Sequence, residues 1–196
     1  AIETLYADRI EEHYEALAHH YYEGQDWEKA LDYLMKAAQK AVAAYANQDA
    51  LAYYDRALLA RDRLGDVPVE ILIGIYGGKA GVSLTINEWA DVVANYSRLR
   101  EVARAAGNRP VEGLALGGVA FGYVWTHEFD LAEATAQEAM ALADELKDDA
   151  IRAGAVFVLG WLDGLRGDLR PCEERVPQAI RLSRETGQPA YELLGR

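Results

Sequence analysis

The residues of this sequence best suited to chemistry lie near its N-terminus, where His19 and His20 are adjacent. Glu15, His19 and Glu23 are four residues apart, so on a helix they would share one face and could offer a metal ion two or three ligands. A metal-dependent enzyme is one interpretation of this row. The sequence has no His-Glu-x-x-His pattern and no second cluster to complete the site, which favours a structural role instead.

The rest of the sequence does not indicate an enzyme. Cys172, the only cysteine, occupies a position where a helical repeat needs a small buried residue, which predicts an inert thiol. Serine does not occur in a Gly-x-Ser-x-Gly elbow. Gly77-Gly78 and Gly117-Gly118 lack the Lys-Ser/Thr ending of a phosphate loop, so we expect them at close helix contacts. We therefore expect no catalysis, no cofactor and no metal.

The charge and hydropathy of the chain make two classes of partner unfavourable. A formal net charge of −12 repels phosphate backbones and anionic lipid, and no basic stripe offsets it, so we expect no nucleic-acid and no membrane partner. The longest apolar runs, such as residues 154–162, are too short to span a bilayer, and no signal-peptide pattern opens the sequence. With one cysteine and no possible internal disulfide, these features predict a cytoplasmic protein.

The apolar residues predict an all-α fold. Ala, Leu, Tyr and Trp recur at steps of three and four, and no segment alternates as a strand would. Breaks rich in Gly, Pro and Asx separate about nine helices and a truncated tenth, and the short turns permit only antiparallel neighbours. Pro177 lies inside the helix that should begin near Pro171, which predicts a kink or a break.

A fixed period organises these helices. Trp89, Phe129 and Leu169 each open a second helix after a short turn, and they are spaced by 40 residues. Such a period indicates stacked helical hairpins, that is, an α–α superhelix in which each hairpin needs its neighbours to cover its apolar faces.

The stretch 14–37, YEALAHHYYEGQDWEKALDYLMKA, resembles a tetratricopeptide (TPR) repeat, a helix-turn-helix unit of about 34 residues. Ala18 and Ala30 stand where such a repeat needs small residues, with Tyr21 and Trp27 on the two sides of the gap. The resemblance extends over the whole chain and implies one domain, a right-handed solenoid. Its expected hairpins cover about 5–44, 27–64, 68–106, 110–146 and 150–186, followed by a truncated helix at 189–196.

A narrower resemblance rests on the runs His19-His20-Tyr21, 26–31, 36–41 and 45–50. They are similar to the TPR regions that follow an NTPase module in large bacterial regulators, namely multidomain adenylate or guanylate cyclases and MalT-like, LuxR-type activators. The resemblance implies an interaction or signal-relay segment of a larger protein. The sequence contains no P-loop, cyclase motif or helix-turn-helix DNA reader, so we expect such activities outside it.

The expected binding residues come from two parts of the chain. If first helices line a concave groove, an aromatic patch forms from two repeats and could receive a peptide or a domain. Near the N-terminus, His20 and Tyr21 would pack inward, and an acidic row would face the groove and favour a basic partner. The predicted groove residues are His19, Tyr22, Glu23, Phe121, Val124, Trp125, Phe157, Trp161 and Leu165.

Two alternatives remain open for the aromatic patch. It could be covered by a second copy of the chain, which would make the protein a homodimer, or by further repeats. It could instead form a closed pocket near Tyr123, Trp125 and Trp161 that senses a small inducer, as the MalT-like resemblance implies.

Overall fold

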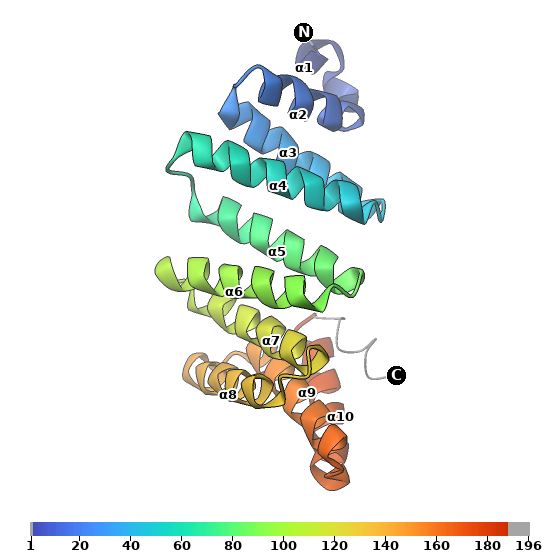
Figure 1. The fold of residues 1–196 in the computed structure, drawn as a ribbon, viewed down its shortest axis with the longest axis vertical. Coiled ribbons are helices and arrows are strands. Elements are labelled where there is room, and N and C mark those ends of the chain that lie inside the picture. Colours follow the sequence, from blue (N-terminus) through green and yellow to red (C-terminus); the bar gives the residue numbers. More distant parts are fainter. Residues whose placement is uncertain (1, 188–196) are drawn as a thin grey trace. The chain divides into compact units, whose positions relative to one another are not determined.

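The computed structural model describes residues 2–187, and throughout this range the regular structure is helical, without a strand. The all-α prediction is confirmed. The elements, labelled in Figure 1, are α1 (Ile2–Leu5), the 3-10 segment η1 (Ala7–His13), α2 (Tyr14–Glu23), α3 (Trp27–Ala43), α4 (Asn47–Leu64), α5 (Val69–Thr85), α6 (Trp89–Ala105), α7 (Arg109–Trp125), α8 (Phe129–Leu146), α9 (Asp149–Arg166) and α10 (Leu169–Glu185).

The chain forms two compact units, Ala1–Ile86 and Asn87–Arg196. In unit 1, α3 packs against both α2 and α4, and α4 against α5; in unit 2, each helix from α6 to α10 packs against the next, and α7 also packs against α9. Consecutive helices therefore pack against each other within each unit. The hairpin bounds expected at 5–44, 27–64, 110–146 and 150–186 stay predictions. The hairpin at 68–106 crosses the boundary between the units, so it stays a prediction, as does the single continuous domain. The helix expected at 189–196 lies outside the described residues.

The turns between helices share one backbone conformation. A residue just after the helix end adopts the left-handed region, as Gln25, His127 and Gly167 do. The amide of the residue after this left-handed position then donates to a carbonyl inside the helix; the N–O distance is 2.9 Å both from Glu128 to Tyr123 and from Asp168 to Asp163. This is a helix C-cap, and its recurrence at equivalent positions 40 residues apart explains the period seen in the sequence.

Small residues lie where the helices cross. Ala18 and Ala30 are fully buried, as the repeat pattern predicts, and each helix from α4 to α10 also contains at least one fully buried alanine. In unit 2, Gly113 and Gly118 lie so close to neighbouring side chains that an added Cβ would stand 2.3 Å from Ile151 Cδ1 and 2.6 Å from the ring of Tyr96. The predicted role of these glycines in close helix packing is confirmed at these positions.

Gly118 and Gly81 provide a matched test of this packing. We expect Gly118→Ala to lower the free energy of unfolding by about 1–3 kcal/mol, because the new methyl overlaps the base of the Tyr96 ring. Gly81, also inside a helix, has no atom within 4 Å of an added Cβ, so Gly81→Ala should stabilise the protein by about 0.5–1 kcal/mol. Urea denaturation of both variants checks this pair, and equal effects would contradict it.

Two sequence expectations about α10 need correction. The helix continues from Leu169 to Glu185 through Pro177, so of the kink or break expected there, the break does not occur. Pro177 is exposed, so the carbonyl that loses its helical donor can bind water, which reduces the cost of the missing hydrogen bond. Cys172 is half-buried rather than buried, although its sulfur does lie at a tight crossing, 3.2 Å from where a Cβ on Gly164 would stand.

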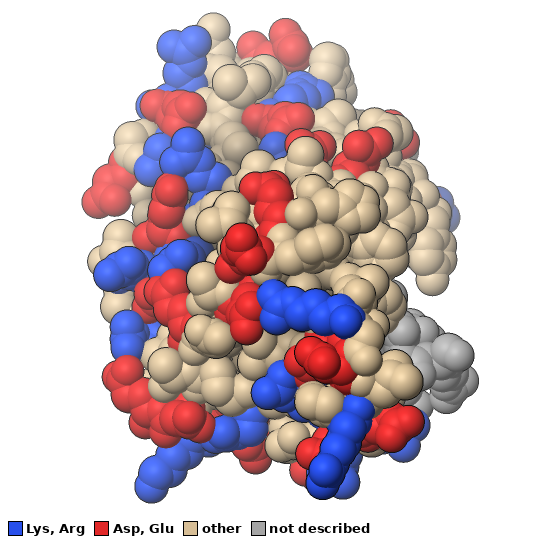
Figure 2. All heavy atoms as spheres, turned by 60° about the horizontal axis from the view of Figure 1, so that its bottom comes forward, with Lys and Arg blue, Asp and Glu red and all other residues tan. Residues whose placement is uncertain are grey.

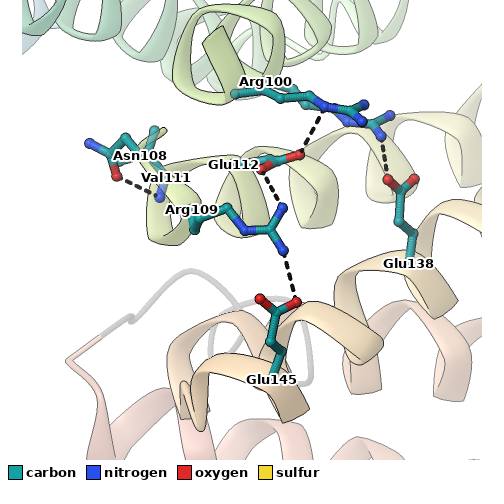
Figure 3. Close-up of polar contacts among 8 residues, drawn as sticks. Arg100, Asn108, Arg109, Val111, Glu112, Glu138 and Glu145 are labelled. Carbon is teal, nitrogen blue, oxygen red and sulfur yellow. Dashed lines mark hydrogen bonds and ion pairs between the residues drawn. The ribbon is translucent and has the colours of Figure 1, made fainter. Parts of the chain in front are cut away.

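A network of ion pairs around a buried carboxylate links α6, α7 and α8 of unit 2, as Figure 3 shows. Glu112 in α7 is 3% exposed, and its carboxylate lies 3.3 Å from Arg109 Nη1 and 3.8 Å from Arg104 Nε in α6. Arg109 also donates to Glu145 in α8 at 2.8 Å, and Arg100 pairs with Glu138. The arginines therefore compensate the one acidic side chain that α7 buries.

A polar cluster holds α1 against α3 in unit 1. Tyr33 donates to Glu3 Oε1 at 2.8 Å, while Lys29 Nζ lies 3.2 Å from Glu3 Oε2 and 3.0 Å from the Tyr21 hydroxyl. These hydrogen bonds, that from Tyr33 foremost, lower the pKa of Glu3 from 4.5 to about 2. Burial and the hydrogen bond to Glu3 raise the pKa of Tyr33 to about 12, so its hydroxyl stays a donor at neutral pH.

The lowered pKa of Glu3 predicts how this cluster responds to acid. Because the folded-state pKa lies below the ordinary value, the stabilisation is fully present above pH 4.5 and is lost as the pH falls from there to about 2. An NMR titration of the Glu3 carboxyl carbon should give a midpoint near 2, and Tyr33→Phe should move that midpoint upward. A midpoint at the ordinary value in the unmodified protein would contradict the cluster.

Candidate functional site

The side chains of the N-terminal row, Glu15, His19 and Glu23, do not converge as a metal site. Glu15 pairs with Lys40 in α3, with 2.8 Å between Oε1 and Nζ, and His19 and His20 are both exposed with their rings 5.7 Å apart. Among residues 2–187, no three His, Cys, Asp or Glu side chains converge as they would around a metal ion. The predicted inward packing of His20 is wrong, because its side chain is exposed on the face of α2 that points away from α3.

The aromatic residues beside this row are held in place by their neighbours. Tyr21 stacks on Tyr33 at 5.6 Å, with 10° between the ring planes, as its predicted inward packing requires. Tyr22 meets the ring of Trp27 edge-on at 5.3 Å and lies under the guanidinium of Arg56 at 4.4 Å. Tyr22 is therefore a half-buried packing residue, and only His19 and Glu23 of the predicted N-terminal set are exposed.

In unit 2, five aromatic rings form a continuous cluster drawn from three helices. Trp89 of α6 stacks on Trp125 of α7, with 4.8 Å between centroids and 9° between planes. Trp125 continues to Trp161 of α9 at 5.8 Å, while Phe121 and Phe157 contact each other at 6.1 Å beneath the tryptophans. Rings fixed on several sides lose little freedom when a partner covers them, which is the property of a binding anchor.

Burial corrects part of the predicted groove. Phe121 and Val124 are each 4% exposed and Phe157 is fully buried, so these side chains support the cluster and present no surface to a partner. The reason is that α7 packs against α6, α8 and α9, which leaves little of its surface open. Trp125, Trp161 and Leu165 keep accessible surface, and Leu165 is 56% exposed.

The accessible apolar residues collect where first helices end and second helices begin. Trp125 ends α7 and Phe129 opens α8; Leu165 lies in the last turn of α9 and Leu169 opens α10. Because α7 and α9 are both first helices of hairpins and pack on each other, these two turns lie at the same end of unit 2. We call this set the turn edge: Trp125, Phe129, Leu165 and Leu169. All four are large apolar residues with exposed side chains, and Leu169 is 66% exposed.

Sequence reasoning placed Trp89 at the start of a second helix but did not include it in the candidate site. Its stacking on Trp125 makes it part of the cluster. The signal was available in the 40-residue period, because Trp89 is the equivalent of Phe129 and Leu169 and so must lie at a turn of the same kind.

Two ion pairs lie close to the turn edge. Arg166 binds Glu133 at 2.6 Å, and Arg175 binds Asp163 at the same distance. Acidic and basic side chains are interspersed over the face shown in Figure 2, with uncharged surface between them. The apolar residues are therefore the distinctive feature of this part of the unit.

Two further findings concern other classes of function. No helix in the described range 2–187 combines the length and apolarity needed to cross a membrane.

Four clefts formed by the described residues are lined by other side chains and not by Tyr123, Trp125 or Trp161, so they do not support the closed inducer pocket expected there.

The fold and the turn edge together define an all-α protein of paired antiparallel helices. It is similar to the crystal structure of BtubC (BKLC) from P. vanneervenii, with a TM-score of 0.64 and 18% sequence identity over 91% of this chain and 71% of that one. No protein-family model matches the sequence, and no curated protein matches it. The likeness concerns the fold, and the TPR assignment stays a prediction.

Proposed function

We propose that the protein is an interaction module that binds an apolar segment of a partner protein at the turn edge, within a larger bacterial regulatory protein. The observation that carries the proposal is Trp125, which is 37% exposed yet fixed by stacking on Trp89 and by contact with Trp161. A preorganised, half-exposed tryptophan among exposed leucines and a phenylalanine is the composition of an interface hot spot.

The arrangement supports binding rather than bond chemistry. The side chains at the turn edge offer rings and alkyl groups, and the nearby arginines are engaged in ion pairs. A partner helix or extended segment with large apolar side chains would find anchors on both turns. The signal-relay role and the regulatory context follow from the sequence resemblance and belong to the same proposal.

Selection of displayed random peptides on the immobilised protein tests this function. We expect enriched peptides to carry aromatic or large aliphatic anchors and to lose binding to Trp125→Ala, while binding to Tyr45→Ala is retained. Tyr45 is the matched control because it is 82% exposed but belongs to unit 1, whereas the aromatic cluster belongs to unit 2. Peptides that bind both variants equally would contradict the proposal, and association only between copies of the chain, seen by sedimentation, would assign the edge to a homodimer.

A further inference from the structure

A second surface, within unit 1 and independent of the turn edge, has the form of a ligand site. A cleft of about 570 Å³ lies between α3, the linker after α4 and the start of α5. This volume falls within the range of pockets that bind small molecules or side chains of a partner. The cleft involves residues of unit 1 only.

The floor of the cleft is apolar. Leu31 of α3 is 3% exposed, and Met35, Leu64, Val67 and Ile71 pack partly buried against the same core. Gly74 and Met35 are closely packed in this floor, because a Cβ added at Gly74 would lie 3.2 Å from Met35 Cε. An occupant could therefore bury alkyl groups here against a surface that the core already fixes.

The sides of the cleft carry charge of one sign. Glu28 and Asp32 lie on α3, and Asp66 and Glu70 lie across from them on the linker and on α5, while the lining contains no lysine or arginine. Asp32 pairs with Lys36 at 2.7 Å, but Glu28, Asp66 and Glu70 make no ion pair with any described residue. Carboxylates on both sides of an apolar floor raise the affinity of an occupant that brings its own cations.

We propose that this cleft binds a basic amphipathic segment of a partner protein, in which large aliphatic side chains enter the floor and flanking arginines or lysines meet Glu28, Asp66 and Glu70. Arginine fits best, because its planar guanidinium donates two parallel hydrogen bonds to a carboxylate. The carboxylates favour a positively charged partner, and the apolar floor limits binding to segments that also present aliphatic side chains.

Fluorescence anisotropy with a labelled peptide in which leucines are flanked by arginines tests the cleft. We expect Glu28→Gln with Glu70→Gln to weaken binding about five- to tenfold, because two exposed charge pairs are lost. The matched control, Glu11→Gln with Asp49→Asn, removes the same charge elsewhere on unit 1, where both side chains are exposed, and should leave the affinity unchanged. Added salt should weaken binding of the unmodified protein.

Two further peptides separate a cleft from general attraction between opposite charges. A peptide with glutamine in place of arginine, and one with glycine in place of leucine, should each bind more weakly than the parent. Equal affinity of the two double variants, equal affinity of the glycine peptide, or no binding of the parent peptide at low salt would each overturn the proposal. Trp125→Ala should not alter this binding, so failure here and failure at the turn edge are distinguishable.

Discussion

Replacing Trp125 with alanine is expected to weaken partner binding at the turn edge by about 2 kcal/mol, or roughly 30-fold in Kd. The indole is the largest accessible side chain of the turn edge and is held by Trp89 at 4.8 Å and Trp161 at 5.8 Å, so it binds without first being ordered. The Kd of Trp125→Phe should lie between that of the unmodified protein and that of Trp125→Ala, because the smaller ring retains part of the stacking. Titration calorimetry with a selected peptide measures all three proteins.

The same substitution also removes a stacking contact, so its effect on folding must be separated from its effect on binding. Circular dichroism and thermal melting of Trp125→Ala show whether the unit remains folded at the temperature of the titration. Tyr45→Ala serves as the exposed control and should bind as the unmodified protein does. Unchanged affinity in folded Trp125→Ala would remove the turn edge as the binding surface.

Phe157→Ala is expected to lower the free energy of unfolding of unit 2 by about 3–5 kcal/mol. Phe157 is fully buried in α9, and its ring contacts Phe121 at 6.1 Å and Trp161 at 5.6 Å, so truncation leaves a cavity beneath the aromatic cluster. Leu165→Ala on the same helix is the matched control. Because Leu165 is 56% exposed, its truncation should cost less than about 1 kcal/mol.

Tryptophan fluorescence can follow this unfolding selectively. Trp89, Trp125 and Trp161 lie in unit 2, and Trp27 is the fourth tryptophan of the chain and lies in unit 1. In a Trp27→Phe background, the fluorescence during urea denaturation therefore reports on unit 2 alone. Similar losses for Phe157→Ala and Leu165→Ala would contradict the burial difference on which the prediction rests.

Local sequence signals were sufficient for the helices and their turns. The caps at Asp26, Asn108 and Asp148 accept backbone hydrogen bonds from the first turn of the following helix, and each stands at a break that the sequence marks. Helical spacing also accounts for two of the ring contacts, because Phe121 with Trp125 and Phe157 with Trp161 are four residues apart on one helix each. The packing of α7 against α9 then joins the two pairs.

Exposure was harder to predict, because it depends on how many neighbours each helix has. Helix α7 is apolar on several sides and packs against three helices, so periodicity alone does not show that Phe121 and Val124 are covered. The cleft of unit 1 was not predicted either. Its carboxylates come from separate segments, around Glu28 and around Asp66, and only the packing of α5 beside α3 brings them to one opening.

The buried Glu112 bears on the alignment of the helices in unit 2. Arg109 belongs to the same helix as Glu112, but Arg104 belongs to α6 and Glu145 to α8. If α7 slid by one turn, about 5.4 Å, Glu112 would leave Arg104 and Arg109 would leave Glu145, although small apolar residues would still meet small apolar residues along much of the helix. A core rich in alanine and glycine distinguishes poorly between such registers, and these charges give α7 one position along its axis.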